Sequence, residues 1–144
     1  MTFSTNSSVS TSYGVGEPSA ALATRVTGVE LYRIGDMTGP GLEKVRPGID
    51  ISVVVEDGVD WVEGTPKGGA SARSSMYALR RHTSRWWRLP KESRMSSQLT
   101  IRNDHGHHWL IEPATDMRVA EYRALLRELG GLFVCLTTSP LVSG

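Results

Sequence analysis

The segment 99–112 restricts the possible fold most, because its pattern is that of two strands joined by a turn. In the first part, apolar and polar residues alternate strictly, which predicts a strand with Leu99 and Ile101 facing the core. The sequence Asn-Asp-His-Gly at 103–106 is typical of a turn, and residues 107–112 predict a second strand. Two strands connected so closely pair antiparallel, so the segment predicts a hairpin.

The second strand of this hairpin separates two kinds of side chain. Because successive side chains point to opposite faces, His108, Leu110 and Glu112 share one face, and Trp109 and Ile111 share the other, core-facing side. A histidine and a glutamate on one face can point together into a cleft. The alternative is an ordinary hairpin with surface histidines and a core tryptophan, and the spacing alone favours this alternative.

The remaining apolar segments are short and follow no regular strand–helix–strand order. Further strands are expected at 26–34, 50–55, 59–65, 86–89 and 132–136, with a loop at 35–48, an Asp57-Gly58 turn and a flexible turn at 65–71. The apolar mass of Val53–Val55 is expected to be buried, and the run 132–136 is expected to be a strand buried on both faces. This order predicts an α+β domain with mainly antiparallel sheets.

Two helices are expected. A short one would begin near Ser71 and extend to Arg81. A longer amphipathic helix would be capped by Thr115 or Asp116 and end at about Leu129, followed by Gly130-Gly131 in the left-handed conformation. Its buried stripe would consist of Val119, Tyr122, Leu125, Leu126 and Leu129.

Length and composition favour one domain. The 144 residues suit a single core, which we place at 25–138, between a flexible Ser/Thr-rich tail at 1–24 and a short tail at 139–144. The first residues show no secretory-signal pattern, and no apolar run approaches the ~20 residues that span a bilayer. A single cysteine, Cys135, excludes an intrachain disulfide and fits either a reducing compartment or a protein that does not rely on oxidation.

Charge is balanced overall but not locally. The net charge is +1, yet residues 70–91 contain no acidic residue and six basic ones, whereas residues 50–63 contain five acidic residues and no basic one. The Arg-rich segment 73–94 contains Trp86 and Trp87, and together with His108 it leaves open an RNA-directed activity. Such runs are more often solvated faces.

Two other kinds of chemistry are disfavoured. His105, His107 and His108 lie close together, but the paired spacings of structural zinc sites are absent and a strand puts His107 and His108 on opposite faces. The sequence therefore predicts no metal site. A serine hydrolase is disfavoured because there is no nucleophile-elbow motif.

A nucleotide-binding cleft remains as a fourth hypothesis. It needs an arginine for the pyrophosphate, a glycine-rich turn with a serine against a ribose, and a polar strand residue near the second ribose. Arg33, the turn Gly68-Gly69-Ala70-Ser71, and His108 with Glu112 supply these groups from three different elements.

An ordered series of short motifs resembles the Tse effector toxins with an ADP-ribosyltransferase-like fold, a family that includes type VI secretion toxins. The motifs span roughly 26–129 and are Leu31-Tyr32-Arg33, Arg46-Pro-Gly-Ile-Asp50-Ile51, Asp57-Gly58, Gly68-Gly69-Ala70-Ser71, Pro90, Leu99-Thr-Ile101, Asn103-Asp104, His107-His108-Trp109-Leu-Ile111-Glu-Pro113, Met117, Tyr122 and Leu125. The turn departs from the family pattern at Ala70, where threonine is frequent.

The resemblance implies split, mainly antiparallel sheets around a cleft with a few flanking helices. It implies NAD as cofactor and substrate, an ADP-ribose acceptor, an immunity protein as partner, and action in the cytoplasm after delivery. The implied catalytic residues are Arg33, Ser71, His108 and Glu112, and the implied NAD-binding residues are Tyr32, Arg33, Gly69, Ser71 and His108. The glutamate of such enzymes stabilises an oxocarbenium-like transition state. Glu121 is the alternative to Glu112, and a non-catalytic protein-binding module on the same scaffold is the alternative to an enzyme.

Overall fold

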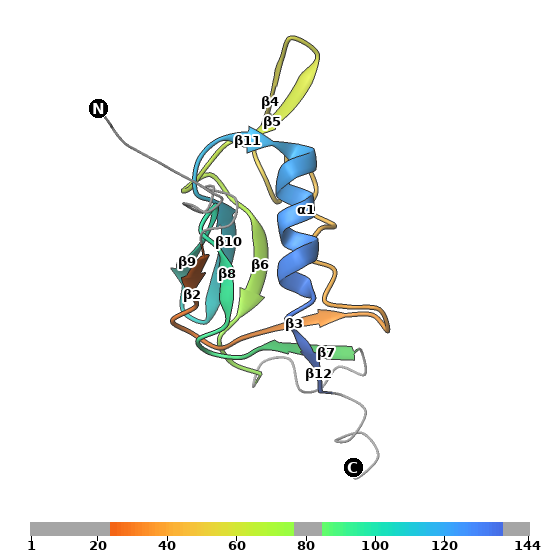
Figure 1. Cartoon of the computed structure of the whole chain (residues 1–144), viewed down its shortest axis with the longest axis vertical. Helices are drawn as coiled ribbons and strands as arrows, with labels where there is room; N and C mark the ends of the chain where they lie inside the picture. Colours follow the sequence, from red (N-terminus) through yellow and green to blue (C-terminus); the bar gives the residue numbers. More distant parts are fainter. Residues whose placement is uncertain (1–23, 77–84, 137–144) are drawn as a thin grey trace, which may run out of the picture.

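The computed structural model describes residues 24–76 and 85–136, which form antiparallel sheets and a helix (Figure 1). The expected tails therefore fall outside the described residues, except Thr24. The elements are β2 (Thr24–Val26), β3 (Leu31–Gly35), β4 (Val53–Glu56), β5 (Val59–Val62), β6 (Ala70–Arg73), β7 (Arg85–Leu89), β8 (Arg94–Ser96), β9 (Leu99–His105), β10 (His108–Pro113), β11 (Met117–Arg118), α1 (Val119–Gly130) and β12 (Val134–Cys135).

The largest sheet has six strands in the order β12-β7-β3-β6-β10-β9. Its two halves meet between β3 and β6, where the paired register is limited to Tyr32 opposite Arg73, whereas β3 pairs with β7 along its whole length. In Figure 1, β3 and β7 run across the base while β6, β9 and β10 stand upright. The antiparallel α+β class is confirmed. Of the few flanking helices expected, the described residues contain α1 alone.

The β4–β5 hairpin belongs to a second sheet, in the order β11-β5-β4, and projects from the rest of the molecule (Figure 1). Its turn at Asp57 and Gly58 has positive φ at both residues, 53° and 75°, as type I′ hairpin turns require, so the predicted turn is confirmed. Val53 packs against the core, but the predicted burial is wrong for the other two valines. Val54 and Val55 are 45% and 65% exposed, because the projecting hairpin has little to pack against.

The amphipathic helix is confirmed, with Tyr122, Leu126 and Leu129 buried. Its predicted start is wrong. Met117–Arg118 pairs with β5 as β11, so the helix begins only at Val119, after an N-cap at Arg118. The predicted left-handed end is also wrong, because Gly131 has φ −67°.

Three further expectations are corrected. The strand at 26–34 is divided into β2 and β3, because Thr27 turns away to bond Ser93. The helix predicted from Ser71 is wrong as far as residue 76, since β6 occupies its start, and the rest of it lies outside the described residues. The doubly buried strand at 132–136 is instead the short edge strand β12, with Leu132 and Val134 more than 40% exposed.

The Tyr122 hydroxyl joins α1 to the large sheet. It donates to the Ile111 carbonyl of β10 and accepts a bond of 3.1 Å from the Ala70 N–H of β6. Burial raises the pKa of Tyr122, so it stays a neutral donor. Gly69 is needed at this contact, because a Cβ there would lie 2.2 Å from the Ile111 carbonyl oxygen.

Helices that could cross a membrane were sought among the described residues, and none has the necessary length and apolar character.

The variant Tyr122→Phe tests this connection. It keeps the ring but leaves the Ala70 N–H and the Ile111 carbonyl without their partner, so we expect a loss of about 1–3 kcal/mol in the free energy of unfolding. Urea denaturation followed by circular dichroism measures this loss. An unchanged midpoint would show that the hydroxyl does not hold the helix in place.

Candidate active site

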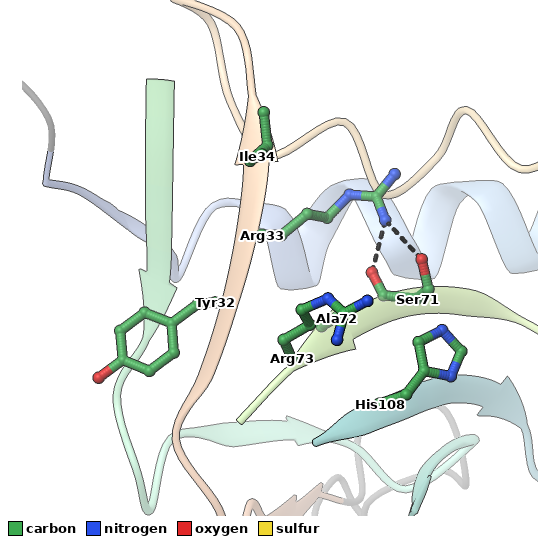
Figure 2. A pocket seen from close by; sticks show the side chains of 7 residues that line it. All are labelled: Tyr32, Arg33, Ile34, Ser71, Ala72, Arg73 and His108. Carbon is green, nitrogen blue, oxygen red and sulfur yellow. Dashed lines mark hydrogen bonds between the residues drawn. The ribbon is translucent and has the colours of Figure 1, made fainter. Parts of the chain in front are cut away.

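Two neighbouring cavities of about 280 and 440 Å³ lie on one side of the large sheet and share Ser71 and His108 in their walls. The first opens between β3 and β6, where the halves of the sheet diverge (Figure 2). The second continues toward the loop 48–52 and the turn 67–69. Together they make a groove, and Arg33, Ser71 and His108, which the sequence placed in one cleft, all lie in its walls.

Arg33 reaches across the junction between β3 and β6. Its Nε donates to the Pro40 carbonyl at 2.7 Å, Nη2 donates to the Gly41 carbonyl at 3.3 Å, and Nη1 donates to the carbonyl of Ser71. Burial lowers the pKa of Arg33, although a guanidinium stays charged under all ordinary conditions. No carboxylate of residues 24–76 or 85–136 forms an ion pair with it, although the more distant charges of Asp50 and Glu43 favour its charged form.

Arg73 is a second cation at the groove that sequence reasoning did not identify. It follows Ser71 by two positions on β6, pairs with His108 in the register, and lines the first cavity (Figure 2). Among the described residues it has no hydrogen-bond or ion-pair partner. The sequence does contain a signal for Arg73, because it follows Ser71 by two positions and on a strand the two side chains then lie on the same face. The expectation of a helix at this point concealed that signal.

His108 is held by Asp104, which was not a predicted site residue. The Nδ1 atom of His108 lies 3.0 Å from Asp104 Oδ2, and the imidazole is 24% exposed. Hydrogen bonds from His105 and from His108 hold the pKa of Asp104 below its usual value. An ionised carboxylate only accepts hydrogen bonds, so Nδ1 of His108 is the donor in this contact, and in a neutral imidazole Nε2 is then the free acceptor.

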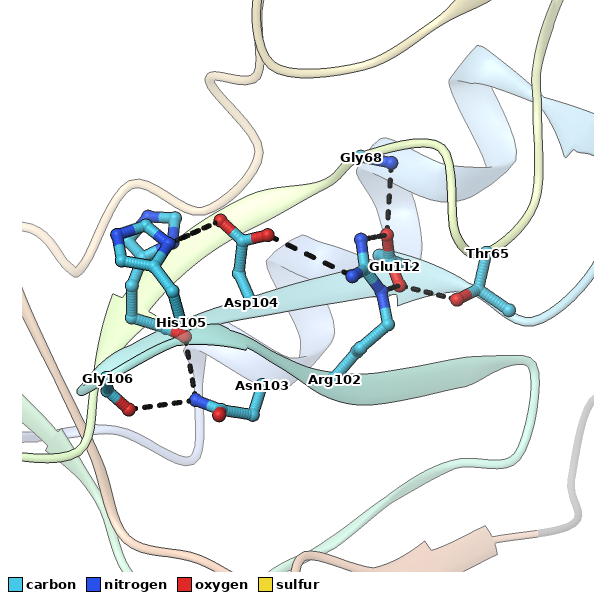
Figure 3. A network of polar contacts seen from close by, with 9 residues as sticks. Thr65, Gly68, Arg102, Asn103, Asp104, His105, Gly106 and Glu112 are labelled. Atoms are coloured by element: carbon cyan, nitrogen blue, oxygen red, sulfur yellow. Dashed lines mark hydrogen bonds and ion pairs between the residues drawn. The ribbon is translucent and has the colours of Figure 1, made fainter.

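Glu112 shares a face with His108 but does not line either cavity. Its carboxylate is fully buried and accepts bonds of 2.8 Å from both Arg102 Nε and Nη2, one from the Thr65 hydroxyl, and one of 3.0 Å from the Gly68 N–H (Figure 3). Burial alone raises the pKa of Glu112, but these bonds more than offset it, so the pKa lies below its usual value. Glu112 thereby fixes the turn that carries Gly68 and Gly69.

The other predicted residues have structural partners. Tyr32 lines the first cavity, but its hydroxyl donates to Glu30, and this bond raises the pKa of Tyr32. Figure 2 shows its ring pointing away from Arg33. Gly69 lines the second cavity. Glu121, the alternative glutamate, accepts the Arg118 N–H at the start of α1, which is a helix-capping role.

The sequence matches the model of one protein family, described as Tse2 ADP-ribosyltransferase toxin, over residues 29–133. The chain belongs to this toxin family. The match runs from before β3 to the residue before β12, and so includes every residue of the groove. No curated relative and no solved structure matches the sequence.

Replacing Arg102 with alanine is expected to reverse the contribution of Glu112 to the pH dependence of stability. With its pKa lowered in the folded state, Glu112 stabilises the wild type at neutral pH, and this contribution is lost as the pH falls through the folded pKa. Without Arg102 the carboxylate is buried and poorly paired, so its folded pKa rises above the unfolded value. The variant should lose roughly 3 kcal/mol at neutral pH and regain part of it on acidification.

Urea midpoints at about pH 7 and about pH 5 measure this reversal. The double variant Arg102→Ala/Glu112→Gln is the matched control, because an amide at this position cannot titrate in that range. Parallel pH profiles for Arg102→Ala and the double variant would contradict the assignment of the effect to Glu112.

Proposed function

We propose that this toxin-family chain binds NAD in the groove lined by Arg33, Ser71 and His108 and cleaves the bond between nicotinamide and ribose, transferring ADP-ribose to a macromolecular acceptor or to water. The observation that carries the proposal is the partly buried guanidinium of Arg33, which has no ion-pair partner among the described residues and lies beside Ser71 and His108. Membership of an ADP-ribosyltransferase toxin family supports it.

The charges of the groove suit a pyrophosphate. A guanidinium has five N–H donors. Arg33 makes four contacts, one of them the long 3.4 Å contact to Ser71 Oγ, so at least one donor remains for an anion. Arg73 adds a second positive charge on the same wall. Guanidinium groups bind phosphate oxygens with charge-assisted hydrogen bonds, so Arg33 and Arg73 would hold the two phosphates.

The polar residues suit the transferase reaction. The bond between ribose C1′ and the nicotinamide nitrogen breaks, its electron pair leaves with nicotinamide, and C1′ gains oxocarbenium-like charge. The acceptor nucleophile then bonds C1′ and releases a proton. His108, with Nδ1 bonded to Asp104, offers Nε2 as acceptor for a ribose hydroxyl or for this proton. The Ser71 hydroxyl supplies a ribose contact, and Glu112 acts indirectly by fixing the turn at Gly68.

The biological role that we propose follows from the family. The chain would act in the cytoplasm of a target cell after delivery, on an acceptor still to be identified, and an immunity protein would neutralise it in the producing cell.

An RNA-directed toxin is the second candidate that the sequence left open. In the described part of the Arg-rich segment, Trp86 is 3% exposed, and the Trp87 indole N–H donates to the Asp36 carbonyl. Bases stack on exposed aromatic rings, so these contacts favour the NAD groove over an RNA surface on β7.

Thermal-shift titration with NAD tests the proposal. A ligand that binds only the native state raises the melting temperature progressively with its concentration. We expect such a rise for the wild type, and an affinity weaker by about tenfold or more in Arg33→Lys, which keeps the charge but loses the fork that binds two oxygens. His107→Ala is the control, because His107 bonds Ser74 and lies outside both cavities. No shift in the wild type, or equal affinity in a folded Arg33→Lys variant, would refute the assignment.

Turnover is a separate prediction. His108→Ala should slow nicotinamide release from NAD by about a hundredfold, the lower range for loss of a general acid–base group, with the melting temperature little changed. Chromatographic measurement of free nicotinamide, with His107→Ala alongside, separates this loss from a general effect of removing a histidine. Equal rates in the two variants would exclude a role for His108 in the reaction.

A further inference from the structure

The hairpin of β9 and β10 contains a bulge that brings three metal-ligating side chains together. His105 is paired with His108, but the next pair is Asn103 with Trp109, so Asp104 is an extra residue on β9. An extra residue disturbs the alternation of side chains and turns the bulged side chain in a new direction. Asp104 consequently lies against both histidines, as its contacts show, and Figure 3 labels it beside His105.

The three donor atoms converge. Asp104 Oδ2 lies 3.0 Å from Nδ1 of His105 and 3.0 Å from Nδ1 of His108, and the two rings stack with centroids 5.0 Å apart. Neighbouring donors in a tetrahedral zinc site, with metal–ligand bonds of about 2.0–2.1 Å, lie about 3.3 Å apart. The 3.0 Å separations between Asp104 Oδ2 and the two Nδ1 atoms are therefore close to those of a zinc site, and a small widening of the cluster makes room for an ion.

We propose that Asp104, His105 and His108 form a binding site for a divalent first-row transition-metal ion, with Zn²⁺ as the leading candidate. Two imidazoles and a carboxylate favour Zn²⁺ and its neighbours over Mg²⁺ and Ca²⁺, which prefer all-oxygen ligands. Three protein ligands leave a fourth position open to water. The other oxygen of Asp104, Oδ1, faces Arg102 Nη1 at 3.9 Å, which leaves Oδ2 available for the metal.

No metal site was predicted from the sequence, because the histidines considered as a pair were His107 and His108, which a strand places on opposite faces. His107 does lie outside the cluster, with its Nδ1 3.1 Å from the Ser74 hydroxyl. The pair that matters is His105 and His108, which face each other across the two-residue turn, and the third ligand depends on the bulge at Asp104. An alternation rule cannot reveal a ligand set that depends on a bulge.

Cobalt titration of the untagged full chain, without NAD, tests the site. Tetrahedral Co²⁺ absorbs strongly in the visible range, and displacement by Zn²⁺ then gives the zinc affinity. We expect one equivalent to bind to the wild type, and an affinity about tenfold weaker or worse for His105→Ala and Asp104→Asn, since even outer partners of metal ligands have effects of this size.

His107→Ala is the matched control, since it removes a neighbouring histidine that is not a ligand, and it should bind Co²⁺ like the wild type. A wild type without the absorption, wild-type affinity in His105→Ala, or loss of the site in His107→Ala would each overturn the proposal. His105 lines neither cavity and NAD is absent, so the outcome is independent of the NAD hypothesis.

Discussion

The buried carboxylate of Glu112 is the interaction on which the geometry of the groove depends. Removing a carboxylate from water is costly unless its oxygens are bonded, and here Arg102, Thr65 and Gly68 bond both of them. These partners belong to β9 and to the turn before β6, so one side chain of β10 holds the neighbouring strand and the glycine turn together. Ser71 lies just after this turn, so the ion pair between Glu112 and Arg102 also fixes the position of Ser71 in the wall of the groove.

The groove itself combines a guanidinium that has no ion-pair partner among the described residues with polar groups that are firmly oriented. Arg33 is fixed by carbonyls of residues 40, 41 and 71, so little side-chain freedom remains to be lost when an anion binds. His108 is oriented by Asp104 in the same way. Preorganised donors and acceptors of this kind are what a reaction with a charged transition state requires, which agrees with the transferase toxin family of the chain.

Local patterns predicted the hairpin, the amphipathic stripe of α1 and the face shared by His108 and Glu112, because these depend on neighbouring residues. They could not predict partners far apart in sequence. The bond between Arg33 and Ser71 joins residues 38 positions apart, and the capture of Met117–Arg118 by β5 moved the start of α1. Arg33, Ser71 and His108 line one cavity, and both the cleft hypothesis and the resemblance had placed them together, whereas Arg73 was hidden by a wrong helix and Asp104 by an unforeseen bulge.

The junction at Tyr32 and Arg73 has a mechanical consequence. Elsewhere neighbouring strands of the large sheet are paired at two or more positions, but here one paired position and the Arg33–Ser71 bond connect its two halves. The first cavity of the groove opens at this junction, so its width follows the angle between the two halves and not the fixed spacing of a continuous strand ladder.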